Sequence, residues 1–287
     1  ARAGLGKSSL ALRVAGCYLC GMDWPNGDAF IGQQGAVLWL EAESAQALNY
    51  QRAGRWGLPL DKILSPFADP LLDVNLGNPR HRQAILAAAK REDVRLIILD
   101  SLSSALPGRD ENDSRIQEPV AWLATLARDT GKPVLACHHL RKRGQLDNDD
   151  AIDVDRLRGS SSIVQPPRII WGLDTPDPAH PEALRLAVIK SNLERFPAPI
   201  GMKIEEGHVR FAAEAPEKAR PIPELEKACD WIRAMLRDGP VNSKIVWDEA
   251  KITGLAEATI LRAKTKLGVD SERKGNAWYW VMPATNR

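Results

Sequence analysis

The N-terminal stretch ARAGLGKSS places a glycine, a lysine and two hydroxyl side chains next to one another. This stretch fits the spacing [AG]-x-x-x-x-G-K-[ST] of a loop that binds nucleotide phosphates. The glycines of such a loop let backbone N–H groups turn toward the phosphates, and the helix that follows adds its positive dipole end. The lysine reaches the β- and γ-phosphates, and the serine hydroxyl coordinates Mg²⁺. The residues expected to bind the nucleotide here are Ala1, Gly4, Gly6, Lys7, Ser8 and Ser9.

A second chemical feature is a carboxylate at the end of an apolar run. VRLIILD ends on Asp100, where a carboxylate can hold Mg²⁺ through water, so Ser8 and Asp100 form the expected metal pair. Ser101 follows and is not an acid, so the carboxylate that orients the attacking water must lie elsewhere. Glu41 and Glu43 close the run AVLWLEAE. Alternation of side chains along a strand does not separate these two candidates.

The composition is that of an ordinary globular protein. The 287 residues are 44% hydrophobic and 26% charged, with a formal net charge of +2, so any nucleic-acid surface must be local. No apolar run approaches the roughly 20 residues of a membrane span. Cys17 and Cys20 form a C-x-x-C pair, but no second pair completes a zinc site. We therefore expect both to pack inside a helix, in a reducing, cytoplasmic setting.

Short apolar runs alternate with helical periodicity, which is typical of an α/β fold with a mostly parallel sheet. The strand that normally leads into a phosphate loop is missing, which we interpret as an N-terminal truncation that removes the first strand. We expect helices over residues 7–20, 44–56, 79–91 and 115–130, and strands over 36–43, 94–100, 132–139, 168–174, 183–191 and 208–212.

The character of the chain changes after residue 212. Residues 213–222 are rich in alanine, proline and charge, as a linker is. Residues 223–287 then show three short helical patterns and a hairpin pattern around the turn RKGN, the order of a winged helix. We therefore expect a nucleotide-binding domain over 1–212, a linker over 213–222 and a winged-helix domain over 223–287.

The order of the motifs is more specific than any one of them. A phosphate loop, a strand ending in E-A-E-S, one ending in L-D-S, one ending in H-H and then R-G-S-S follow one another. This order resembles the RecA-like hexameric helicases, above all the replicative plasmid helicases of the RepA type and related phage and bacterial AAA-domain ATPases. The resemblance covers residues 1–212, and the C-terminal tail is similar to the small winged-helix tail of those ATPases. It implies a RecA-like P-loop core, ATP and Mg²⁺, a homohexamer, and single-stranded DNA as partner.

The resemblance also implies roles for individual residues. It places the catalytic glutamate on Glu43 and the γ-phosphate sensor on His139, the second residue of the His-His element. A cation from the neighbouring subunit, which stabilises transition-state charge, falls on Arg168 or Lys190. Two departures from the family pattern are Ala1, in place of the usual first glycine, and two prolines directly before Arg168.

Positive charge indicates where DNA would bind. The loop after His139 carries several cations, although five aspartates nearly cancel them. Residues 218–287 hold 13 lysines and arginines against nine acids, and Trp278 and Trp280 alternate on the last strand, so one of them can stack near the wing tip. The candidate DNA contacts are Arg141, Lys142, Arg143, Arg158, Arg262, Lys264, Lys266, Arg273 and Lys274.

These features predict an ATP-hydrolysing motor that moves on single-stranded DNA in plasmid, phage or mobile-element replication. A regulator or loader that uses ATP as a switch, without translocating, is the alternative that the winged helix and the nearly neutral loop favour. This alternative predicts binding to duplex DNA through the winged helix. A recombinase or repair ATPase on the same core is a third interpretation.

Overall fold

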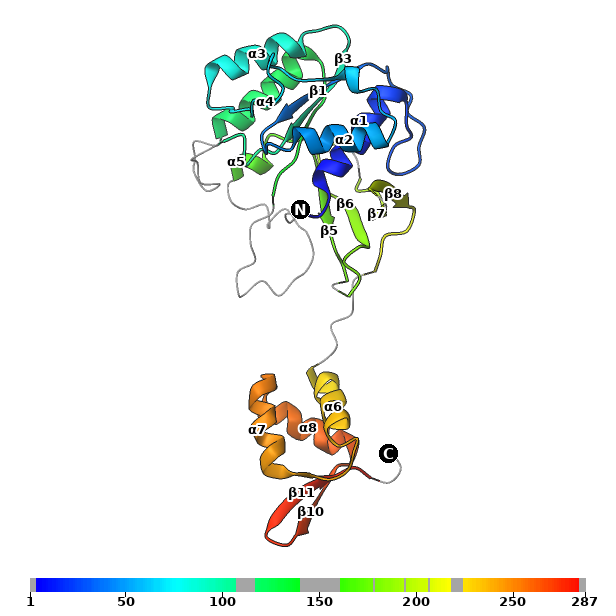
Figure 1. The fold of residues 1–287 in the computed structure, drawn as a ribbon, viewed down its shortest axis with the longest axis vertical. Coiled ribbons are helices and arrows are strands. Elements are labelled where there is room, and N and C mark those ends of the chain that lie inside the picture. The colour runs from blue at the N-terminus through cyan, green and yellow to red at the C-terminus, as the bar shows by residue number, and fades with distance from the viewer. Residues whose placement is uncertain are drawn as a thin grey trace. The chain divides into compact units, whose positions relative to one another are not determined.

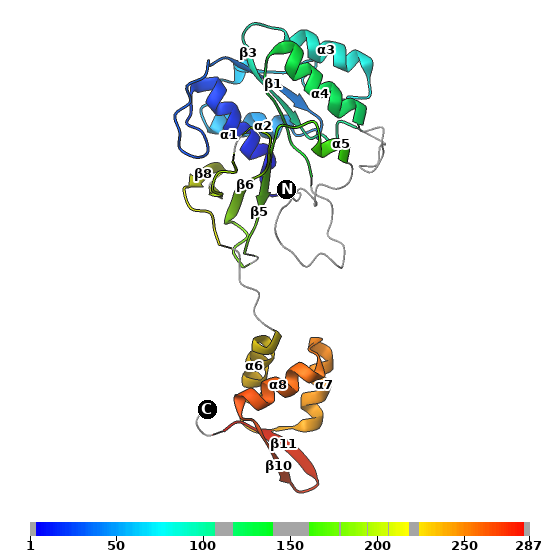
Figure 2. The same ribbon diagram turned by 180° about the vertical axis from the view of Figure 1, so that it is seen from behind.

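The computed structural model describes residues 4–106, 117–139, 161–177, 179–193, 195–205, 207–217 and 224–283. The chain divides into two compact units, Ala1–Ala219 and Arg220–Arg287. Both are drawn in Figure 1 and, from behind, in Figure 2.

The first unit contains a four-stranded parallel sheet in the order β2-β1-β3-β4. Its central strands, β1 and β3, are apolar runs buried on both faces, as is usual for a parallel sheet covered by helices. Parallel strands end at the same edge of a sheet, so the polar residues that follow these strands gather there. The strands are β1 (Ala36–Glu41), β2 (Ile63–Leu64), β3 (Val94–Asp100) and β4 (Val134–Ala136).

Helices cover both faces of this sheet (Figures 1 and 2). On β1, Val37 and Trp39 belong to the core shared with the first helix, and Leu38 and Leu40 belong to the core beneath the third and fourth. This alternation is the period-two pattern of a strand buried on both sides. The helices are α1 (Lys7–Cys20), α2 (Gln46–Arg55), α3 (Pro79–Ala89) and α4 (Gln117–Thr130).

Four later strands form a separate antiparallel sheet in the order β5-β6-β7-β8, which packs against the α1 core. The connections between them are shorter than the dozen or so residues that a parallel crossover needs. The α/β class with a parallel sheet is confirmed, whereas the sequence pattern did not reveal that this second group is antiparallel. It also missed β7 and the short α5. These elements are α5 (Ser161–Val164), β5 (Ile169–Asp174), β6 (Leu184–Ser191), β7 (Ile200–Glu205) and β8 (His208–Ala212).

The second unit has three helices and a three-stranded sheet in the order β10-β11-β9. Its core joins all three helices to the last strand, with Ile232, Val246, Ile260 and Trp280 buried together. Its elements are α6 (Glu224–Met235), β9 (Val241–Asn242), α7 (Ser243–Thr253), α8 (Glu257–Leu267), β10 (Asp270–Lys274) and β11 (Ala277–Val281).

The cysteines lie differently from one another. Cys17 is fully buried in α1, but Cys20 is exposed at the end of the same helix, so the expectation that both are packing residues is wrong for Cys20. The reason is that α1 turns its last residue away from the sheet. The described residues include no group of three or more His, Cys, Asp or Glu arranged to hold a metal ion. They also include no helix long and apolar enough to cross a membrane.

Candidate nucleotide-binding site

The start of α1 carries the phosphate-loop residues. Gly4 and Gly6 have φ angles of 78° and 85°. Residues that carry a side chain rarely adopt such angles, so glycine permits the turn that precedes the helix. A Cβ on Gly6 would also lie 2.3 Å from Cδ1 of Ile204. Lys7 and Ser8 form the first turn of α1, where backbone N–H groups have no partner inside the helix. Ala1 lies outside the described residues, and the Ser9 side chain is buried.

Asp100 ends β3 as a buried carboxylate. It is 1% exposed, and neither of its oxygens has a hydrogen-bond partner among the described residues. Burial raises the pKa of Asp100, and the nearby Ser8 hydroxyl and Lys7 ammonium oppose this shift, although Ser8 makes no hydrogen bond of normal geometry to it. Burying an ionised carboxylate costs several kcal/mol of folding free energy unless a cation or a hydrogen-bond donor compensates its charge. Asp100 and Ser8 therefore fit Mg²⁺, which prefers oxygen ligands and keeps much of its water.

Glu41 and Glu43, which strand alternation could not separate, have different environments. Glu41 is the last residue of β1 and is 3% exposed. Its carboxylate accepts hydrogen bonds from the backbone N–H of Glu43 at 2.9 Å, from Asn49 Nδ2 at 3.1 Å and from Trp39 Nε1 at 3.3 Å. Burial raises the pKa of Glu41, and the hydrogen bonds from the Glu43 backbone and from Asn49 oppose the shift. Glu41 is thus an internal anchor, and the side chain that reaches the site is Glu43.

The Glu43 carboxylate accepts hydrogen bonds from two neighbouring strand ends. Ser101, after β3, donates its hydroxyl proton to Glu43, and His139 Nε2, after β4, lies 3.1 Å from the same oxygen, Oε1. Burial alone would raise the pKa of Glu43. The hydrogen bonds from Ser101 and His139, with the positive charge of Lys7, outweigh burial and lower this pKa. Glu43 is therefore an ionised carboxylate at neutral pH, the form that a general base requires.

His139 lies between the lysine and the glutamate. Its Nδ1 is 3.2 Å from Lys7 Nζ. A protonated lysine can only donate, so Nδ1 is the acceptor and the ring proton sits on Nε2, facing Glu43. Burial lowers the pKa of Lys7, while the negative charges of Glu43 and Asp100 act against this shift. The structure thus brings together Lys7, His139 and Glu43, beside Asp100. His138 points elsewhere, with its Nδ1 3.1 Å from Ser103 Oγ.

A second anchor fixes the chain on the far side of Glu43. Ser44 has a φ of 54°, which is unusual for a residue other than glycine. Its backbone N–H donates to Asp73 Oδ1 at 3.0 Å, and its hydroxyl donates to Asp73 Oδ2. Glu43 is therefore held between two bonded neighbours. The sequence pattern did not reveal Asp73 or the roles of Ser101 and Asn49. The contacts of Asp73 and Ser101 are long-range, and that of Asn49 joins a helix to a strand eight residues earlier. The available signal was a hydroxyl directly after the strand-ending aspartate.

The two candidate cations after β4 differ in freedom. The Arg168 side chain is exposed just before β5. Lys190, on β6, donates to the carbonyls of Val164 at 2.7 Å, Gln165 at 3.0 Å and Pro167 at 2.7 Å. Lys190 is thus occupied within its own subunit, on the segment that leads to Arg168.

The candidate DNA contacts are only partly visible. Arg262 and Lys266 are exposed on α8, and Arg273 and Lys274 are exposed on β10. Lys264 is half-buried, because its ammonium lies 4.6 Å from the centre of the Trp280 ring and donates to Ser271 Oγ at 2.6 Å. It therefore has a packing role that the sequence did not reveal. The remaining candidates, Arg141, Lys142, Arg143 and Arg158, lie outside the described residues.

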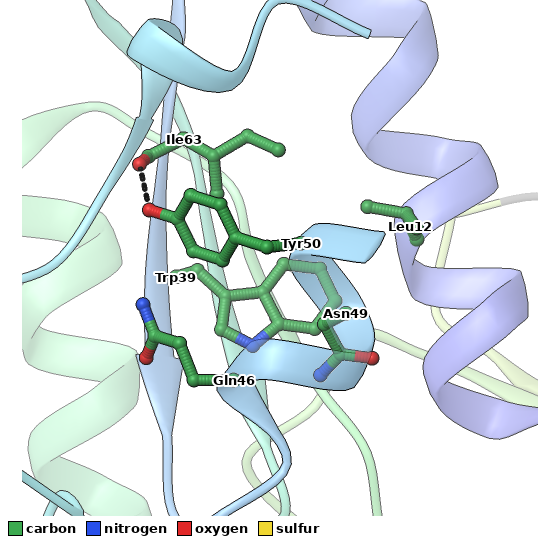
Figure 3. A pocket seen from close by; sticks show the side chains of 6 residues that line it. All are labelled: Leu12, Trp39, Gln46, Asn49, Tyr50 and Ile63. Carbon is green, nitrogen blue, oxygen red and sulfur yellow. Dashed lines mark hydrogen bonds between the residues drawn. The ribbon is translucent and has the colours of Figure 1, made fainter. Parts of the chain in front are cut away.

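A separate small cavity lies between α1, β1 and α2 (Figure 3). It has room for about one water molecule. Tyr50 closes one side by donating its hydroxyl proton to the Ile63 carbonyl at 2.8 Å. The cavity is too small for a nucleotide and is a packing defect beside the Glu41 anchor. Its lining residues are Leu12, Trp39, Gln46, Asn49, Tyr50 and Ile63.

Comparison with known proteins identifies a family and a fold. The family model described as AAA domain matches residues 1–145. No curated protein matches significantly. Two solved structures share the fold. One is described as an ATPase domain, with a TM-score of 0.51 and 16% identity over 74% of this chain and 82% of that one.

The other is a DnaB-like replicative helicase described with its interactions with primase. It has a TM-score of 0.53 and 18% identity over 72% of this chain and 56% of that one. The chain therefore spans little more than half of that helicase. By the family model, which covers half of its length, the chain belongs to the AAA domain family of nucleoside triphosphatases.

Proposed function

We propose that the protein hydrolyses ATP to move on single-stranded DNA, as a replicative helicase of a plasmid, phage or other mobile element. The observation that carries this proposal is the convergence of Lys7, Glu43 and His139 beside the buried Asp100 carboxylate. Likeness in fold to a DnaB-like replicative helicase and to a second solved ATPase domain supports the choice of a motor.

Each residue has a defined task in hydrolysis. Lys7 and the backbone N–H groups of the α1 N-terminus bind the phosphates. Ser8 and Asp100 would hold Mg²⁺, which would neutralise charge on the phosphate oxygens. The Glu43 carboxylate orients a water molecule and accepts its proton as the water oxygen attacks the γ-phosphorus. The bond to the β-phosphate oxygen breaks, which leaves ADP and inorganic phosphate.

His139 links hydrolysis to movement. Its two ring nitrogens contact Lys7, which binds the γ-phosphate, and Glu43, which orients the attacking water. The arrival and the departure of the γ-phosphate therefore alter the surroundings of His139. The chain that follows His139 carries candidate DNA-binding cations. We propose that a neighbouring protomer of a homohexamer supplies Arg168 to the active site. The exposure of Arg168, and the three carbonyl contacts that occupy Lys190, favour Arg168 for this role.

An ATP-switched regulator or loader is the second candidate. The C-terminal unit favours it, because exposed cations lie on α8 and on the β10–β11 hairpin, where a winged helix contacts duplex DNA. Such a protein would hydrolyse ATP slowly and bind duplex DNA in an ATP-dependent way.

ATP hydrolysis with and without single-stranded DNA separates the two candidates. A motor predicts strong stimulation by single strands, its loss in Lys7→Ala, and strand separation of a forked duplex. Lys90→Ala, which removes an exposed lysine at the end of α3, is the matched control and should hydrolyse ATP like the unmodified protein. Hydrolysis that ignores single strands, together with ATP-dependent binding of duplex DNA, would favour the switch.

A further inference from the structure

The two faces of the β10–β11 hairpin have opposite chemistry. In the antiparallel register, Arg273 pairs with Trp278 and Ser271 pairs with Trp280, while Glu272 pairs with Tyr279. Side chains alternate along a strand, so paired residues share a face and their neighbours take the other one. One face therefore carries Ser271, Arg273, Trp278 and Trp280, and the opposite face carries Asp270, Glu272, Lys274 and Tyr279. Both acids of β10 lie on the second face.

The first face runs from the core of the unit to solvent. Trp280 is 3% exposed, packs edge-on against Trp247 with ring centroids 5.5 Å apart, and lies beneath Lys264. Trp278, one step nearer the turn on the same face, is 53% exposed. The result is a half-exposed indole with the Arg273 guanidinium directly across the hairpin and the Lys264 ammonium one pair further along.

We propose that this face binds single-stranded nucleic acid, with Trp278 stacking on an unpaired base and Arg273 contacting the adjacent phosphate. The inference rests on the proposed function and gives it a binding site in the C-terminal unit. The flat face of a base is available to an indole only when the base is unpaired, and base–aromatic stacking does not depend on sequence. The first face is complementary in charge to a phosphate backbone. The cations Arg273 and Lys264 lie on the same side as Trp278, whereas both acids of β10 lie on the opposite face.

Matched substitutions in the full chain test the assignment of faces. Binding of a fluorescently labelled oligothymidylate is measured by anisotropy over a range of salt concentrations. Trp278→Ala should weaken binding roughly tenfold, and Trp278→Phe should restore most of it. Arg273→Ala should weaken binding and lower the slope of log affinity against log salt by about 0.7. Lys274→Ala removes the same charge from the adjacent position on the opposite face and should lower the slope by less than Arg273→Ala does.

Photocrosslinking provides a direct readout that other DNA contacts in the chain do not mask. An oligonucleotide with 5-iododeoxyuridine should crosslink to Trp278, located by mass spectrometry within the peptide that follows Lys274, and Trp278→Ala should remove this crosslink. Thermal unfolding checks that the variants remain folded.

The failures are distinguishable from one another. If the unmodified protein does not bind single strands, the proposed function fails and this inference fails with it. If it binds, but Trp278→Ala binds equally well and no crosslink forms at Trp278, only this inference is overturned. Equal effects of Arg273→Ala and Lys274→Ala would overturn the assignment of faces, and a loss of duplex binding equal to the loss of single-strand binding would overturn stacking on an unpaired base.

Discussion

The backbone N–H of Glu43 donates a 2.9 Å hydrogen bond to the buried carboxylate of Glu41, two residues earlier in the chain. One carboxylate thus sets the position of the other. Glu41 Oε1 holds the Glu43 backbone, while Oε2 accepts from Asn49 and Trp39 inside the core. The two oxygens of Glu41 therefore have separable roles, one toward the site and one toward the fold.

Glu41→Ala should lower both stability and turnover. It removes the acceptor of three donors and should cost about 3 kcal/mol in the free energy of unfolding, because buried donors lose their partner. The kcat for ATP should fall more than KM changes, since Lys7 and Ser8 are untouched. Glu41→Gln keeps an oxygen for the Glu43 N–H but brings an NH₂ group toward Asn49 and Trp39. It should therefore lose stability while it keeps most of kcat. Equal kcat in both variants would rule out a positioning role for Glu41.

Ser101→Ala should move the acidic limb of the pH–kcat profile to higher pH. Glu43 is ionised down to lower pH than an ordinary glutamate because donors, among them the Ser101 hydroxyl, lower its pKa against the effect of burial. Without that donor the pKa rises toward its ordinary value, so the base is lost sooner as pH falls. Ser103→Ala removes a hydroxyl that contacts His138 instead, and its acidic limb should not move. Coincident profiles for Ser101→Ala and the unmodified protein would contradict this account.

Asp100→Asn should stabilise the protein without Mg²⁺ and abolish hydrolysis. The pKa of Asp100 is raised above its unfolded value, chiefly by burial, so its ionised form opposes folding at neutral pH. Removing the charge should raise the free energy of unfolding by about 1–3 kcal/mol. The stability gain of Asp100→Asn over the unmodified protein should shrink as pH falls through the raised pKa, because Asp100 itself then becomes neutral. Unfolding with denaturant at several pH values measures it; a destabilised variant would show that Asp100 has a compensating partner.

Mixed oligomers should reveal whether Arg168 acts in the neighbouring subunit. Arg168→Ala and Glu43→Gln should each reduce hydrolysis by about 10²-fold or more alone. Where an Arg168→Ala protomer supplies Glu43 and a Glu43→Gln protomer supplies Arg168, the shared site is complete. Mixing the two variants should therefore restore part of the activity. No recovery, in mixtures shown to exchange subunits, would place Arg168 and Glu43 in the same protomer or outside the site.

The sequence predicted elements well where local pattern decides them. The apolar run VRLIILD became β3, and Lys7–Cys20 became α1, because burial and helical periodicity are properties of short windows. Alternation could not separate Glu41 from Glu43, because it holds only while the strand continues. The strand ends at Glu41, and contacts from Asp73, far along the chain, fix the turn that follows. Nor could local pattern show that Lys264 packs on Trp280.

Lys190 ties the backbone before Arg168 to the antiparallel sheet. Its ammonium holds three backbone carbonyls between Val164 and Pro167, directly before Arg168. Arg168 also accepts a hydrogen bond through its own carbonyl from the Asn192 N–H, just beyond β6. The backbone at Arg168 is thus tied to the end of β6 by a side chain and by the main chain. We therefore expect a displacement of the Arg168 backbone to be transmitted to β6, whereas the exposed Arg168 side chain can change its rotamer without moving that strand.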